Sequence, residues 1–284
     1  MPGESTAFAD GRVVTIRRPP SHAWRSPATN LRELAKYVDL LRTLTAHRIR
    51  VRYKQSVLGL AWAIVQPLSM MLIFTLVFGR IARVSTDGVP YSLFAFTGLL
   101  LWSFLSTSLN NATHALVSHA QLVTKVYFPR EILPLSYVAA ALFDLLVGSV
   151  VLVAMLAWYG RPITWHVLLA LPVIAMTAML ATALAFVLSA LQVRFRDIGH
   201  AVPLVLYLWM FCTPVAYPLS AVPPRYMAAF RLNPMTAVVE TFRAAILRNQ
   251  VASFPLVPAL TAAVLVLLAY AIFKRAETMM ADVV

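Results

Sequence analysis

The chain has few charged residues and only one cysteine. Charged residues make up 12% of its 284 residues, hydrophobic ones 60%, and the mean hydropathy is +0.76. This composition lies well outside the range of soluble domains and indicates an integral membrane protein. The lone Cys212 excludes an intrachain disulfide and argues against a zinc site.

The motifs of nucleotide binding and hydrolysis are also missing. None of the nine glycines begins a G-x-x-x-x-G-K-[ST] loop, and there is no H-E-x-x-H or G-x-S-x-G motif. The eleven acidic residues are scattered singly, whereas an enzyme acting on lipid-linked phosphates usually pairs aspartates around a divalent metal. We therefore expect no catalytic residue, no metal site and no cofactor on this chain.

The charge that is present is mainly positive, with a net charge of +13. Arg48, Arg50, Arg52 and Lys54 directly precede residues 57–78, which carry no charged side chain. A stretch of that length spans the hydrocarbon core of a bilayer, and cations before it hold the N-terminus in the cytoplasm. Cations that flank apolar segments in this way fit contact with membrane lipids rather than nucleic acid.

The apolar segments predict an all-α integral membrane fold with six transmembrane helices. The expected spans are residues 57–79, 91–110, 132–159, 167–191, 201–219 and 256–273. An even number places both termini in the cytoplasm. The positive-inside rule agrees, because 17 of the 24 Lys and Arg residues then lie on the cytoplasmic side.

The segment before the first span divides into two parts. Residues 1–29 are rich in Pro, Ser and Arg and predict a disordered cytoplasmic tail. Asn30 and Glu33 then form a capping-box pattern, and apolar residues follow at helical spacing. Residues 30–56 therefore predict an amphipathic interface helix, either a simple peripheral anchor or a contact site for a partner. Residues 57–284 form the transmembrane domain.

The connection between the fifth and sixth spans predicts a re-entrant segment. Four prolines between residues 214 and 224 break the chain, and Asn233 with Pro234 supplies an N-cap and a first helical residue. Apolar residues follow at helical spacing, whereas Glu240 and Arg243 are expected to face elsewhere. Such a helix either dips into the outer leaflet or forms a lid on the outer surface.

Five residues within the spans are candidates for lining a channel. Asp144 is the only acidic residue well inside a span, so it either lines a pathway or bonds to Ser149 or to another helix. The others are aromatic, and aromatic faces either guide a sugar polymer or simply pack against lipid and protein. They are Trp62, Phe74, Tyr207 and Phe211.

Four segments together resemble the membrane subunits of ABC-2 type exporters. They read RYKQSVLGLAWAIVQP before the first span, KVYFPREILPLS before the third, VRFRDI after the fourth and LNPMTAVVETFR before the sixth. The resemblance runs from about Leu40 to the C-terminus. Within that family the pattern is similar to permeases that export lipid-linked polysaccharides such as O-antigen, capsule or teichoic-acid precursors.

The resemblance implies a homodimer in the cytoplasmic (inner) membrane, with a polysaccharide channel at its interface. ATP and Mg²⁺ would be bound by two separate ABC ATPase subunits. It also implies that these ATPases contact the entry helix and the loop before the third span. The candidate coupling residues are Arg52, Tyr53, Lys54, Lys125, Phe128, Pro129, Arg130 and Glu131. Two alternatives are an ABC-2 drug or lipid exporter and a membrane-embedded glycosyl or phosphoryl transferase.

Overall fold

The computed structural model describes residues 4–9, 12–17, 36–54, 58–86, 88–125, 128–248 and 256–283. The chain divides into two units, Met1–Asp39 and Leu40–Val284. In the first unit, β1 (Glu4–Ala9) and β2 (Arg12–Arg17) pair as an antiparallel hairpin. We expected a disordered tail here. That expectation overlooked the β-branched run at residues 13–16, which favours an extended strand.

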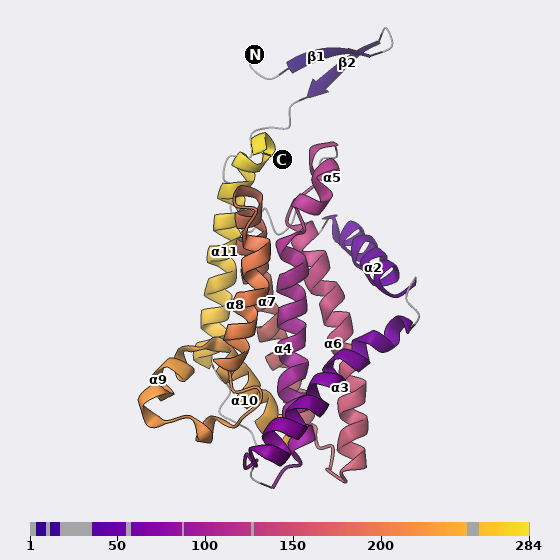
Figure 1. Ribbon diagram of the computed structural model, residues 1–284. Coiled ribbons are helices and arrows are strands. Elements are labelled where there is room, and N and C mark those ends of the chain that lie inside the picture. The colour runs from indigo at the N-terminus through magenta and orange to yellow at the C-terminus, as the bar shows by residue number, and fades with distance from the viewer. Residues whose placement is uncertain are drawn as a thin grey trace. The chain divides into compact units, whose positions relative to one another are not determined.

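The described part of the second unit is helical throughout. Its first helix, α2 (Val38–Lys54), lies within the expected interface helix and has no fully buried residue. The capping-box residues Asn30 and Glu33 lie outside the described residues. In Figure 1, α2 runs beside α6 (Ile132–Trp158).

Four helices among the described residues are long and apolar enough to cross a membrane. They are Gly59–Ile81, Tyr91–Thr113, Ile132–Trp158 and Trp165–Arg194, and each end lies within three residues of its expected position. The first consists of η1 (Gly59–Ala61), α3 (Trp62–Phe74) and the π-helical η2 (Thr75–Ile81). The second is α4, the third is α6, and the fourth joins η4 (Trp165–Leu169) to α7 (Ala170–Arg194).

The fifth apolar helix is shorter than the sequence predicted. We expected a span over residues 201–219, but α8 covers Ile198–Phe211 and the chain then turns. The early end follows from Pro214, because proline lacks an N–H and disfavours helical backbone at the residue before it. The sixth expected span falls within α11 (Leu256–Val283).

Helix α4 forms the centre of the bundle. In the most apolar stretch of Tyr91–Thr113, 78% of the residues are buried. In the corresponding stretch of Gly59–Ile81, only 17% are buried. Figure 1 shows α3 crossing obliquely over α4 and α6, with which it makes contact. The core forms around α4, where Leu99, Leu105 and Leu109 pack with residues of α6, α7 and α10 (Pro234–Leu247). Helix α3 therefore leaves much of its surface for contact with lipid or with another chain.

The segment after α8 contains η5 (Leu219–Ala221), α9 (Pro224–Leu232) and α10. The expected N-cap is confirmed, because Asn233 Oδ1 accepts a hydrogen bond of 3.1 Å from Met235 N and Pro234 is the first helical residue. The expected apolar face of α10 is buried against α4 and α7. In Figure 1, α9 and α10 lie at the end of the bundle opposite to α5 (Ala120–Lys125), which follows η3 (Val117–His119).

One expectation for α10 was wrong. Arg243 does not face away from the bundle, since only 3% of it is exposed. Its guanidinium donates to Pro214 O and Val215 O, both at 2.5 Å, and lies 3.6 Å above the Phe94 ring. The turn after α8 leaves carbonyls without helical partners, and a buried guanidinium satisfies them. From the spacing of the apolar residues alone, we expected Arg243 to lie off the buried face of the helix.

Candidate functional site

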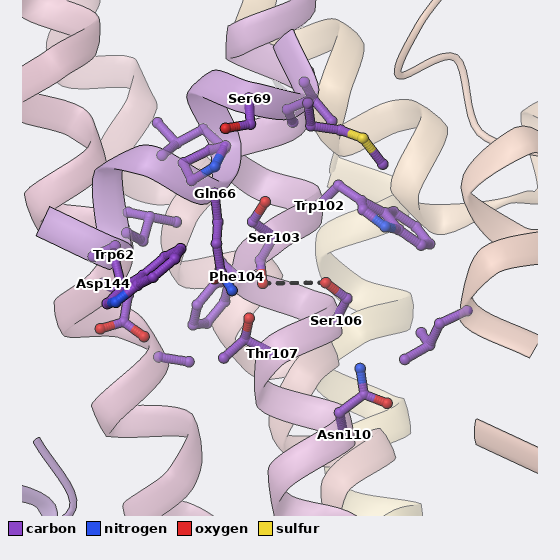
Figure 2. A pocket seen from close by; sticks show the side chains of 18 of the residues that line it. Trp62, Gln66, Ser69, Trp102, Ser103, Phe104, Ser106, Thr107, Asn110 and Asp144 are labelled. Atoms are coloured by element: carbon purple, nitrogen blue, oxygen red, sulfur yellow. Dashed lines mark hydrogen bonds between the residues drawn. The ribbon is translucent and has the colours of Figure 1, made fainter. Parts of the chain in front are cut away.

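A cavity of about 890 Å³ lies among α3, α4, α6 and α8, with Arg52 and Tyr53 of α2 at its wall. Its side chains include aromatic rings and neutral hydrogen-bonding groups beside many aliphatic ones, and Arg52 and Asp144 carry charge. Figure 2 shows Trp62, Gln66 and Ser69 of α3 on one side and the polar residues of α4 on the other. A site of this size and chemistry accommodates a small molecule or a short stretch of polymer.

The polar wall of the cavity is a stripe along α4. Ser103, Thr107 and Asn110 follow one another at spacings of four and three residues, so they share one face of the helix. Ser106 Oγ is bonded back to Ser103 O at 3.3 Å. In contrast, Asn110 Oδ1 is buried and accepts no hydrogen bond from the described residues. A buried acceptor without a donor costs about 1–3 kcal/mol, so this oxygen favours a water molecule that donates to it.

Aromatic residues from three helices complete the wall. Trp62 of α3 and Tyr207 of α8 leave 44% and 63% of their surfaces exposed, so their ring faces are accessible. Trp102 of α4 is buried, and its ring meets that of Trp209 edge to face with 5.7 Å between centroids. Flat rings beside hydroxyl and amide groups suit a ligand with apolar C–H faces and many hydroxyls.

Asp144 of α6 lies in the cavity wall and joins α6 to α2. Its carboxylate forms an ion pair with Arg52 and accepts a hydrogen bond of 2.5 Å from the Tyr53 hydroxyl. Burial and the bond to Asp144 raise the pKa of Tyr53 to about 12, so its hydroxyl remains a donor at neutral pH. The expected bond to another helix is therefore confirmed, and Asp144 also lines this cavity; that it lines a transport pathway stays a prediction. Ser149 instead donates to Leu145 O at 2.8 Å.

A second contact holds α2 against α6. Arg48 Nε donates to Ser136 Oγ at 2.7 Å, and its guanidinium lies 3.4 Å above the Tyr137 ring. Together with Arg52 and Tyr53, this cation fixes one side of α2 to the transmembrane bundle. The fully exposed side of α2, which includes Lys54, remains for other contacts.

Glu131 connects the loop before α6 to α11. Glu131 is 2% exposed, and its carboxylate pairs with Lys274 of α11 at 3.0 Å and accepts from Tyr270 at 3.3 Å. Phe128 is buried, whereas Pro129 and Arg130 are partly exposed. The side chain of Lys125 lies outside the described residues. Of the coupling candidates in this loop, Pro129 and Arg130 are thus accessible, and Glu131 connects the loop to the last helix.

At the other end of the bundle, side chains from α4 and α10 hold the turn after α8. In addition to the two bonds from Arg243, Tyr91 donates to Ala216 O and Asn233 Nδ2 donates to Cys212 O at 3.0 Å. Gly98 makes room for this arrangement, since a Cβ there would lie 2.5 Å from Arg243 Nη2 and 3.0 Å from Val215 O. We call residues 212–217 with these side chains the turn clamp.

The structure brings some of the candidate channel residues together and separates others. Trp62, Asp144 and Tyr207 line the cavity, whereas Phe74 and Phe211 are not among its lining residues. Phe74 is buried, with its ring 5.6 Å from that of Phe78, and Phe211 is 54% exposed. The polar stripe of α4 was not predicted from the sequence. Polar residues at helical spacing within an apolar span were the signal for it.

Comparison with known proteins places the chain among transporters. Residues 39–247 match the family model described as ABC-2 type transporter. The chain is 34% identical over 240 residues to the O-antigen export system permease protein RfbA of Myxococcus xanthus, covering 84% of this chain and 92% of the relative. It is 31% identical over 250 residues to RfbA of Klebsiella pneumoniae, covering 86% and 95%. The polysialic acid transport protein KpsM of Escherichia coli is 23% identical over 218 residues, covering 72% and 80%.

Proposed function

Because the chain belongs to the ABC-2 type transporter family and is related to O-antigen and polysaccharide export permeases, we propose that it exports lipid-linked polysaccharide. It acts as the membrane-spanning subunit, and the cavity among α3, α4, α6 and α8 is a segment of the polymer's path. The observation that carries this proposal is the lining of the cavity. Aromatic rings and neutral donors and acceptors both occur in it, a combination that suits the C–H faces and hydroxyls of a sugar chain.

The lining also weighs against the two alternatives. An exporter of lipids or apolar drugs needs a uniformly apolar wall, whereas Gln66, Ser103, Thr107 and Asn110 present hydrogen-bonding groups here. A glycosyl or phosphoryl transferase needs an available acid or base. The one acidic residue of the described lining, Asp144, is already engaged by Arg52 and Tyr53.

A second copy of the chain completes the path. Helices α3 and α8 border the cavity and expose large apolar side chains beside it, including Ile73, Leu204 and Leu208. A two-fold arrangement would bury these surfaces and enclose the cavity from both sides. The homodimer has six spans per chain, with α8 and α11 as the fifth and sixth, and α10 lies at the outer side as a re-entrant helix.

Energy comes from two ABC ATPase subunits that bind ATP and Mg²⁺. The chain itself has no phosphate-binding loop. The exposed face of α2 and the loop around Arg130 contact these subunits on the cytoplasmic side of the inner membrane, where both termini also lie. Nucleotide binding then shifts the bundle between two packed arrangements.

Two neighbouring aromatic residues of α8 provide a matched test of the path. Tyr207 lines the cavity, whereas Phe211, one turn further along, is exposed but outside the lining. We expect Tyr207→Ala to reduce polymer export severalfold, because one aromatic stacking contact is worth about 0.5–1.5 kcal/mol, and Phe211→Ala to leave it unchanged. Export is measured as polysaccharide at the surface of cells that carry the partner ATPase. Equal export by both variants would contradict the assignment of the path.

A further inference from the structure

The two charges that line the cavity among the described residues neutralise each other. Among the described residues that line it, Arg52 and Asp144 are the only charged ones, and they form an ion pair with each other. The remaining lining side chains are aromatic, aliphatic, hydroxyl, amide or thioether groups. The cavity therefore offers hydrogen bonds and ring faces but no uncompensated charge.

This balance has a consequence for an acidic polymer. A carboxylate that leaves water for a site with low-dielectric walls loses hydration, and a cation without another partner offsets that loss more strongly than neutral donors do. Pores that conduct anions accordingly carry unpaired Arg or Lys residues. Here the one cation of the described lining is engaged by Asp144, which would also repel an approaching carboxylate.

A second copy does not alter the balance. A two-fold axis would add the same Arg52–Asp144 pair, so the described lining of the enclosed path would again carry no net charge. Figure 2 shows how the neutral groups dominate the space: Gln66, Ser103, Thr107 and Asn110 surround it, with Asp144 at the edge.

From this arrangement we infer that the polymer this chain exports is an uncharged glycan, and that the Arg52–Asp144 pair excludes polyanionic ones. The inference rests on the proposed function and adds the chemical class of the substrate. It sets this chain apart from its relative named for polysialic acid, which is an acidic polymer. Neutral sugar hydroxyls donate to acceptors such as Gln66 Oε1, and their C–H faces stack on Trp62.

Gln66 provides a direct test, because its side chain is exposed within the cavity and can be changed without disturbing the core. Gln66→Lys and Gln66→Glu place opposite charges at one position with side chains of similar length. The full-length permease, assembled with its ATPase in nanodiscs, is titrated with a neutral oligomannoside and with an oligosialic acid. Binding is followed by fluorescence of Trp62 and Trp102.

We expect the wild-type complex to bind the neutral oligomer more tightly than the acidic one. Gln66→Lys should raise affinity for the acidic oligomer about tenfold, and Gln66→Glu should lower it by a similar factor, as expected for a unit charge acting across several ångströms of a partly hydrated site. Affinity for the neutral oligomer should change less than threefold in both, on the order of the hydrogen bond that is altered.

The ion pair itself is tested with Asp144→Asn, which frees the Arg52 charge while keeping an acceptor for Tyr53. This variant should also gain affinity for the acidic oligomer. Asp197→Asn is the matched control, since Asp197 is exposed and outside the lining, and it should behave as wild type. Equal or tighter wild-type binding of the acidic oligomer would overturn the inference alone. Binding of neither oligomer would overturn the proposed function and the inference with it.

Discussion

Two of the bonds in the turn clamp come from a single buried cation, so replacing Arg243 should have a large effect. The guanidinium donates to two backbone carbonyls at 2.5 Å and lies over the Phe94 ring. A hydrogen bond from a charged donor contributes about 1.5–3 kcal/mol, and the ring contact adds about 1–2 kcal/mol. Desolvation of the guanidinium offsets part of this sum. We expect Arg243→Met to lower the free energy of unfolding by about 2–6 kcal/mol, because it leaves two buried carbonyls without donors at about 1–3 kcal/mol each.

The clamp offers its own reporter of this change. Cys212 is exposed at the start of the clamped turn and is the only cysteine of the chain. In Arg243→Met, Pro214 O and Val215 O lose their donors, so the turn should loosen and the rate of Cys212 modification by a maleimide should change. Arg243→Lys should recover part of the stability, because a single ammonium retains the charge but lacks the planar fork.

Two measurements decide the question. Denaturant unfolding of the purified protein in detergent gives the free-energy difference, and maleimide labelling of the native protein gives the state of the turn. Unfolding of Arg243→Met at the wild-type denaturant concentration, with an unchanged labelling rate, would refute the reasoning. The same two measurements on Gly98→Ala test the space that the guanidinium occupies, since a Cβ there would lie 2.5 Å from Arg243 Nη2.

Three further predictions concern the end of the bundle near α5 and the partner subunits. Gly199→Ala should destabilise the protein by about 1–3 kcal/mol through overpacking. A Cβ at this position would lie 3.0 Å from His114 Nε2 and nearer still to His114 Cε1. Adding His114→Ala to the same chain should restore most of the lost stability, measured by thermal unfolding. Lys274→Met should cost more stability than Lys274→Met with Glu131→Gln, because the single change leaves a carboxylate that is 2% exposed without its ammonium partner; equal melting temperatures would contradict this. The purified chain should hydrolyse no ATP until an ABC ATPase subunit is added, and phosphate release by the chain alone would exclude a separate ATPase as the source of energy.

The positions of the helices could be predicted where the signal was local. The charge-free stretch after Lys54 and the Asn233–Pro234 pair are each contiguous in the sequence, and both gave helices near the expected residues. The end of the fifth span was placed too late. The four prolines of this segment predicted a break in the chain. Pro214 also disfavours helical backbone just before it, and α8 therefore ends at Phe211.

The candidate site was predicted less well, because its residues come from distant parts of the chain. Asp144 stood out as an acid in an apolar span, but its partners Arg52 and Tyr53 lie 92 and 91 residues away. Similarly, Glu131 was predicted to contact the ATPase subunits, and its partner Lys274 is 143 residues away. No spacing rule connects such pairs.

The sequence by itself determined that this is a membrane protein, which segments form its apolar helices, and which family it resembles. Hydrophobic length, prolines and caps act on neighbouring residues, so the order of amino acids is enough to read them. Only the tertiary structure decided the rotation of each helix about its axis. That rotation turned Tyr207 toward the cavity and left Phe211 outside its lining, and it buried Arg243 beneath the turn after α8. In an apolar helix, few polar residues mark the inner face, so side-chain packing against the neighbouring helices sets it.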